Sequence, residues 1–371
     1  MYQTKKLQNT RIDVADALRG IAVAGIILFH SVEHFNVFTQ ETIAHTLPCD
    51  SVVFDVMKWL LSGKMYGIFA MLFGLSFFIM NDNQQQKGKS FSGRFAWRMC
   101  LLLLFGLINT AFYDGDILVT YAILGMLLIP CSYLPTKVVW CIVGFLAIQP
   151  VEVYSLLTGW QINADNLWTT FTMMGIVHQH GGIIDCALVN LHYGFYADVY
   201  YFIYTGRFTQ ILCLFILGML LGRHRFLYNE GRNLHHWRII FIVSVLLTVI
   251  GSIVTFGILE KWLTPIYNLC ILMMIVSGVV LMWYTSCRAK KALGHLCTFG
   301  RMSLTNYFLQ SIIGSFVFCG YGLACYRHFG TTYALLVGVA MVLAQYMFCR
   351  IWFRNHSRGP IEGVWRKLTW I

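Results

Sequence analysis

Long apolar runs recur along the whole chain and are separated by short polar stretches. Crossing a membrane as a helix takes about 20 apolar residues. Ten runs approach or reach that length, at residues 15–32, 64–81, 99–113, 117–133, 138–158, 208–222, 238–257, 264–286, 303–319 and 331–352. The pattern predicts an all-α, polytopic membrane helix bundle of about ten transmembrane helices.

Three segments outside these runs have a different pattern. Residues 35–62 turn amphipathic near their end and predict a helix lying at the membrane surface. Residues 159–206 form the longest stretch without a predicted crossing and are rich in aromatic residues and histidine, among them Trp160 and Trp168. Residues 354–371 end in tryptophan and basic residues and predict a short helix on the inner leaflet.

The basic residues fix the expected orientation. With the N-terminus inside, 22 of the 27 lysines and arginines fall at inner ends. The five left outside are Lys58, Lys64, Arg207, Lys261 and Arg327. Cytoplasmic loops carry such an excess, so both termini should be cytoplasmic. The net charge of +11 is therefore explained by topology, and no nucleic-acid partner is expected.

Ionisable side chains follow one face of the first run. Arg19 and His30 are eleven residues apart, which at ~100° per residue returns to within about 20° of the same direction. Asp16 and His34 extend the stripe at both ends by helical spacing. Because ionisable groups inside a membrane are costly, they mark functional sites by default.

Several motifs together resemble the YeiB-like family, which carries domain of unknown function 418. They lie in the order that family shows, at residues 16–20, 64–74, 114–118, 300–310 and 359–366. The family is in turn distantly similar to the membrane acyltransferases of family three and to heparan-alpha-glucosaminide N-acetyltransferase. The Arg19–His30 spacing matches the arginine and histidine of the family-three enzymes.

The resemblance implies one transmembrane acyltransferase-like domain over residues 1–371, in the bacterial plasma (inner) membrane. It implies transfer of an acyl group, in the first instance acetyl, from cytosolic acyl-CoA to an extracytoplasmic or lipid-linked glycan. Acetyl-CoA would be the donor substrate, with no tightly bound cofactor. The expected partners are therefore the lipid bilayer, acyl-CoA and the sugar acceptor, and a homodimer stays open.

One departure from the family pattern concerns two positions. Relatives are expected to carry asparagine in place of His30 and histidine in place of Asn109. Such an exchange predicts that the two side chains face each other in one pocket, within hydrogen-bonding reach directly or through one water, and close to Asp114 or Asp116.

The candidate catalytic residues each have two interpretations. A neutral His30 can act as general base or take the acyl group itself, or it can be a core histidine bonded to a carbonyl group. Asp114 or Asp116 can orient His30 or bind an acceptor hydroxyl, whereas at least one of them can simply cap a helix. Asn109 belongs to the same predicted pocket.

Each candidate donor-binding residue also has two interpretations. Arg19 can hold the CoA phosphates or pantetheine, or snorkel to the interface paired with Asp16. Arg98 and Arg301 are weaker phosphate candidates that can equally be topological anchors.

On the acceptor side, the polar positions of the ninth run share one face, where they either bond helices together or line a cavity. They are Ser303, Asn306, Tyr307 and Gln310. Trp168 would be part of an aromatic platform that stacks on the sugar of the acceptor. No metal site is predicted.

Two other classes stay open. A transporter or flippase would use the buried charges to bind substrate or carry protons. The absence of an inverted repeat and of matched broken helices in the sequence counts against it. A non-catalytic partner in an envelope assembly would lack a ligand-accessible cavity between the first, third and fourth runs.

Overall fold

The computed structural model describes residues 11–37, 43–159, 165–228, 233–254 and 260–370, so Trp160 lies outside the described residues. Within these ranges the protein is helical, with one isolated bridge between His45 and Phe329. The helices of the first half are α1 (Asp13–Val32), η1 (His34–Asn36), α2 (Asp50–Leu61), α3 (Met65–Gln85), α4 (Ser92–Thr110), α5 (Ile117–Gly125), α6 (Leu128–Tyr133), α7 (Thr136–Ala147), α8 (Pro150–Thr158) and α9 (Asp165–His180). Those of the second half are α10 (Ile183–Val189), η2 (Asn190–Gly194), α11 (Phe195–Tyr204), α12 (Arg207–Arg223), α13 (Leu234–Val254), α14 (Glu260–Thr285), α15 (Cys287–Arg301), α16 (Ser303–Phe318), η3 (Cys325–Arg327), α17 (Thr331–Asn355) and α18 (Pro360–Thr369).

The predicted all-α class is confirmed, and every one of the ten apolar runs coincides with helix. Among the described residues, five helical stretches are long and apolar enough to cross a membrane, or up to seven if each of two bent pairs counts as one crossing. Three predicted runs correspond to helices that are not long and apolar enough to count as membrane crossings by themselves. These helices are α4, α5 with α6, and α16. The chain is therefore a protein with several membrane-type helices.

The two bent pairs were not expected from the sequence. α7 and α8 meet at 45°, and the α10–α11 segment meets α12 at 78°. Gly206 closes the second bend with φ of 67°, a conformation that glycine adopts without strain. The Thr209 hydroxyl donates to Gln149 Oε1 at 2.6 Å, which joins the two breaks. The sequence showed no matched pair of broken helices, and these two breaks are a feature that only the structure reveals.

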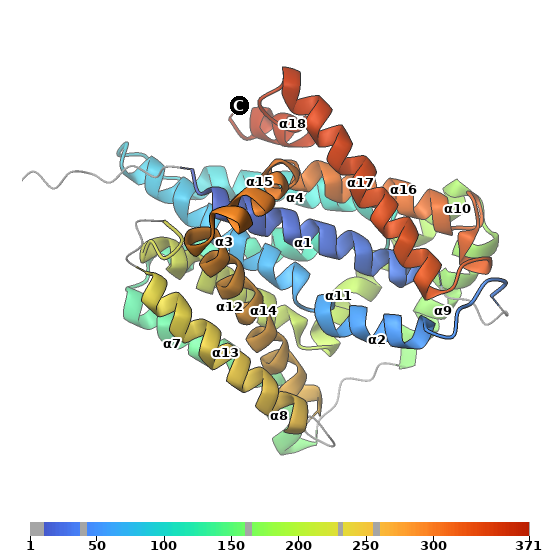
Figure 1. Ribbon diagram of the computed structural model, residues 1–371, viewed down its shortest axis with the longest axis horizontal. Helices are drawn as coiled ribbons and strands as arrows, with labels where there is room; N and C mark the ends of the chain where they lie inside the picture. Colours follow the sequence, from blue (N-terminus) through green and yellow to red (C-terminus); the bar gives the residue numbers. More distant parts are fainter. Residues whose placement is uncertain (1–10, 38–42, 160–164, 229–232, 255–259, 371) are drawn as a thin grey trace, which may run out of the picture.

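The bundle is arranged around α1. In Figure 1, α1 crosses the middle of the molecule, with α17 and α15 beside it and α9 and α10 at its far end. α13 and α14 pack on each other at the opposite edge, and α13 turns Leu246 and Ile253 outward with 57% and 72% exposure. Such an apolar outer face is typical of a helix in contact with lipid.

α3 and α12 approach each other through glycine. A Cβ atom added at Gly74 would overlap the carbonyl oxygen of Phe215, and one added at Gly218 would overlap that of Met71. Small residues on both helices therefore bring the two backbones into contact, as membrane helices do when packing replaces the hydrophobic effect.

Valine at Gly218 should separate these two helices. Overpacking costs about 1 to 3 kcal/mol, and more where backbone is the obstacle, so Gly218→Val should markedly lower the melting temperature of the detergent-solubilised protein. Gly144→Val is the matched control, because nothing lies within 4 Å of a Cβ at Gly144. Equal melting temperatures for the two variants would show that the α3–α12 contact is not tight.

Candidate functional site

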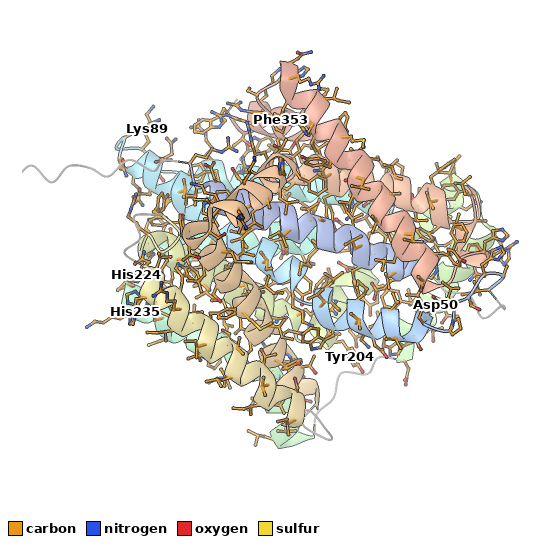
Figure 2. All side chains as sticks on the ribbon, viewed as in Figure 1. Asp50, Lys89, Tyr204, His224, His235 and Phe353 are labelled. Carbon is orange, nitrogen blue, oxygen red and sulfur yellow. The ribbon has the colours of Figure 1, made fainter. Side chains whose placement is uncertain are left out.

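Two cavities open among the described helices. The larger, of about 1290 Å³, is the basic cavity, whose lining includes nine cationic side chains and only two acidic ones, Asp16 and Glu362. The cationic residues are Arg11, Arg19, Lys87, Lys89, Arg94, Arg98, Arg301, Arg358 and Arg366. In Figure 2, the labelled Lys89 and Phe353, which both line it, lie on the upper side of the view, and Asp50 lies at the opposite side. All three arginines predicted to bind the donor thus meet in one cavity.

Asp16 links two of these cations. Arg19 Nη1 and Arg11 Nη2 donate to different oxygens of the Asp16 carboxylate, each at 2.6 Å. Arg19 Nη2 also donates to the Ser76 hydroxyl at 2.6 Å. One carboxylate thus serves two guanidinium groups, so the cluster keeps a net positive charge while Arg19 is held rigidly. Arg19 is thus paired with Asp16 and also lines the basic cavity.

The C-terminal helix α18 forms a wall of the basic cavity. The guanidinium of Arg98 lies 3.5 Å from the centroid of the Trp365 ring, and that of Arg94 lies 4.5 Å from Trp370. Arg301 lies 4.4 Å from the Phe353 ring and donates to the Ser357 carbonyl at 3.3 Å. Arg98 Nε has no hydrogen-bond partner among the described residues.

Glu362 fixes α18 against the beginning of α16. Its carboxylate accepts from the backbone N–H of Leu304 at 2.8 Å and from the N–H and hydroxyl of Thr305 at 3.0 and 2.6 Å. Burial raises the pKa of Glu362, and these hydrogen bonds oppose the rise. A carboxylate at this place satisfies backbone donors that a helix start leaves free.

The smaller cavity, of about 720 Å³, is the aromatic cavity. Predicted residues His30, Tyr307 and Trp168 line it. The segment 159–206 supplies much of its wall through α9 and α11, including Phe171, Ile176, Asp198 and Tyr201. The long aromatic segment therefore lies where an acceptor platform was expected.

His30 sits among rings and one amide. Its ring centroid lies 4.7 Å from Tyr113 and 5.8 Å from Phe35, and Gln310 lies beside it. Gln310 is close enough to act on the His30 ring, but neither amide atom of Gln310, nor Nδ1 of His30, makes a hydrogen bond of good distance and angle in the described residues. Buried polar atoms are nearly always bonded, so this pair can take a bond from a bound molecule or water.

No direct hydrogen bond joins His30 and Asn109 in the described residues. Asn109 Nδ2 donates instead to Asp116 at 2.9 Å, and Asp114 accepts from Asn36 Nδ2 at 3.1 Å. No hydrogen bond in the described residues joins His30 to Asn109 or to either aspartate. Tyr113 lies against His30 in their place, and Asp116 begins α5, so the two carboxylates have structural partners of their own.

Two further expectations change. Asn306 lines neither cavity, because its amide donates to the Phe299 carbonyl at 3.1 Å and to Cys349 Sγ at 3.4 Å and so joins helices. His34 leaves the stripe because α1 ends at Val32 and residues 34–36 take φ of 52°, 50° and 64°. Its Nε2 lies 2.8 Å from the Phe329 carbonyl oxygen.

The aromatic cavity also contains residues that the sequence did not single out. Tyr113, Glu33, Asp198 and Arg207 all line it. In the sequence, Arg207 is only one of five cations expected on the outer side. That outer position was the signal by which the sequence could have indicated it as a site residue. Among the described residues, no three His, Cys, Asp or Glu side chains are placed to hold a metal ion.

The two cavities end one helical turn apart. On α3, Tyr66 lines the aromatic cavity and Phe69 the basic one; on α16, Tyr307 and Ser303 divide in the same way. Three or four residues along a helix span about 5 to 6 Å. A thin layer of side chains thus separates a cationic site from a histidine-containing one.

Comparison with known proteins finds relatives that are similar in sequence over nearly the full length. A family model described as "Protein of unknown function (DUF418)" matches residues 221–371. "Uncharacterized protein YxaH" of Bacillus subtilis (strain 168) is 27% identical over 393 residues, covering 98% of this chain and 96% of that protein. "Uncharacterized protein YeiB" of Escherichia coli (strain K12) is 24% identical, covering 95% of both chains.

The DUF418 match and the near full-length similarity to YxaH and YeiB support a YeiB-like DUF418 assignment. The resemblance seen in the motifs is thereby confirmed. No solved structure is significantly similar to the chain. The region matched by the DUF418 model includes α15, α17 and α18, which supply Arg301, Phe353 and Glu362 to the basic cavity.

Glu362→Ala should loosen α18 from this DUF418 region. Leaving the donors of Leu304 and Thr305 unsatisfied should cost about 2 kcal/mol of stability. Limited proteolysis should then release the C-terminal helix faster than in the parent protein. Asp55→Ala is the control, because Asp55 is an exposed carboxylate on α2. Unchanged proteolysis of Glu362→Ala would mean that α18 is held by its tryptophans alone.

Proposed function

We propose that this protein is a membrane acyltransferase that takes an acyl group, in the simplest case acetyl, from acyl-CoA in the basic cavity. The acceptor is an extracytoplasmic or lipid-linked glycan in the aromatic cavity. The observation that carries the proposal is the pair of cavities of opposite character that end one turn apart on α3 and α16. A thioester reaching across that layer would meet the acceptor.

The chemistry of the basic cavity suits the donor. Coenzyme A carries several phosphate charges, and guanidinium groups bind phosphate through paired, charge-assisted hydrogen bonds. Arg19, Arg98 and Arg301 are the residues we assign to it. Arg19 lies deepest along α1, which suits a contact with the pantetheine arm, whereas the other two stand beside α18 and suit the phosphates.

In the aromatic cavity His30 would be the catalytic residue. As general base it would take the proton from an acceptor hydroxyl or amine while that oxygen or nitrogen attacks the thioester carbonyl carbon. The new C–O or C–N bond forms, the C–S bond breaks, and the proton finally goes to the CoA thiolate. In the covalent variant, a His30 nitrogen attacks first and passes the acyl group on. Tyr113 and Gln310 would position the ring.

The membrane arrangement forms part of the proposal. All ten apolar runs would cross the bilayer of a bacterial plasma membrane, with both termini and the basic cavity on the cytoplasmic side. Residues of both ends of the described chain, Arg11 and Trp370, line that same cavity. Acyl-CoA is a cytosolic compound, so the orientation given by the positive charges would place the donor site where the donor is.

A transporter or flippase is the second candidate, and the bent helices favour it. Broken helices that present charged side chains to a cavity are typical of transporter binding sites. The 78° bend leads into Arg207, which lines the aromatic cavity. The two candidates differ in whether a covalent bond to the acyl group is made.

Acetyl-CoA should stabilise the purified protein against heat. The shift should grow with ligand concentration, by about 2.7 kcal/mol at a hundred times the Kd. Arg98→Ala with Arg301→Ala should weaken binding, and the exposed Arg238→Gln should not.

His30→Ala should bind acetyl-CoA normally, yet membranes containing it should fail to transfer radiolabelled acetyl groups to envelope glycans. Absence of stabilisation in the parent protein would exclude the donor; normal labelling by His30→Ala would exclude its catalytic role.

The topology should be readable by reporter fusions. A fusion at residue 371 should be active only as a cytoplasmic reporter, and one near residue 170, in α9, only as an extracytoplasmic one. A cytoplasmic reporter active near residue 170 would place both cavities on the wrong sides and end the proposed direction of transfer.

A further inference from the structure

Two cations, one lining the aromatic cavity and one beside it, have no acidic residue at ion-pair distance. Arg207 lines the cavity between two rings, its guanidinium 5.5 Å from the centroid of Tyr66 and 5.0 Å from that of Tyr201. Lys64 is not part of the lining but lies between the lining residues Gly63 and Met65, and it is only 4% exposed. No ion pair within 4 Å involves Arg207 or Lys64 in the described residues. Neither cation is therefore neutralised by a direct contact.

These cations also act on each other. Lys64 lies near enough to Arg207 and to Lys58 for their like charges to repel it. Glu33 and Asp198 line the same cavity and attract Arg207, but from beyond ion-pair distance. Holding two such cations close together in a membrane protein is costly, and a bound anion would offset that cost.

The fold brings the two cations to helix junctions. Lys64 stands between Gly63, with φ of 79°, and the start of α3. Arg207 is the first residue of α12, directly after Gly206 at the 78° bend. Tyr66 links the two sides, because its hydroxyl donates to Gln210 on α12 at 2.9 Å while its ring faces Arg207. The bend thus brings the Arg207 guanidinium to the cavity, where a straight helix would have continued.

The remaining lining indicates what kind of anion fits. Phe29, Phe171 and Ile176 give the aromatic cavity an apolar wall, and His30 stands on the same cavity. Guanidinium and ammonium groups together are typical phosphate ligands. A soluble anion would leave the apolar wall without a partner, whereas a phosphate attached to hydrocarbon would cover it.

We propose that the acceptor is a phosphate-bearing amphiphile, whose phosphate is bound by Arg207 and Lys64 while its reacting hydroxyl or amine faces His30. This rests on the proposed function for the role of His30 alone. The phosphate site itself is independent of acyl transfer. Its chemistry fits a lipid headgroup, a lipid-linked sugar phosphate or a free phosphate.

Binding can be measured without acyl-CoA. Protein purified in a phosphate-free maltoside detergent would be titrated with dioctanoyl phosphatidate and followed by thermal stabilisation. Dioctanoylglycerol has the same chains without phosphate, and inorganic phosphate has the anion without chains. We expect phosphatidate to bind at least tenfold more tightly than either. Equal binding of inorganic phosphate would assign the site to a free phosphate, and equal binding of dioctanoylglycerol would overturn the proposal.

Variants separate this site from general charge effects. Arg207→Gln and Lys64→Met should each weaken phosphatidate binding about tenfold, and Arg238→Gln, on the exposed side of α13, should leave it unchanged. Arg207→Lys, which keeps the charge and loses the paired geometry, should give an intermediate affinity and guards against loss of folding. Parent-like affinity in both Arg207→Gln and Lys64→Met would overturn the proposal. Loss of the phosphate proposal would not affect the proposed acyl transfer, which the acetyl-CoA binding and His30→Ala labelling experiments test separately.

Discussion

The close packing of α3 on α12 is the constraint on which the rest of this structure depends. Because Gly74 and Gly218 each receive a backbone carbonyl of the other helix, the two helices cannot slide past each other without steric overlap. α3 then presents Tyr66 to one cavity and Phe69 to the other, and α12 begins at Arg207. Both cavities are therefore built on one rigid pair, and their separation is a property of that pair.

Charge is distributed so that each end of the bundle has its own character. In the basic cavity Asp16 holds two arginines, and Arg94, Arg98 and Arg301 lie over aromatic rings, which keeps these guanidinium groups ordered without neutralising them. In the aromatic cavity cations and carboxylates face each other across a wider space. A cavity of the first kind attracts a polyanion, and one of the second kind orients a molecule with separate charged and reactive ends.

The sequence predicted the helices well, because membrane-type helices need long apolar runs whatever their neighbours. It also placed Arg19 and His30 on one helix face, although they serve different cavities. What it missed depends on tertiary contacts. The breaks at Gln149 and Gly206 hold through the Thr209–Gln149 bond, and the loss of His34 follows from a left-handed turn. The sequence also could not indicate that the Asn109 amide donates to Asp116 and not to His30.

The layer between the cavities consists of side chains, and this bears on mechanism. Tyr307 is 2% exposed. Its hydroxyl accepts a hydrogen bond from the Ile117 N–H at 3.3 Å, so the start of α5 fixes its position. Phe69 and Phe73 lie on the other side of the layer, on α3. A change of rotamer in these rings would admit a slender arm such as pantetheine while the helix backbones stay fixed. Transport of a whole substrate would instead require the bends at Gln149 and Gly206 to move, against the glycine contact that ties α12 to α3. Under the proposed acyl transfer, the tight α3–α12 pair would stay fixed while the reactive group passes.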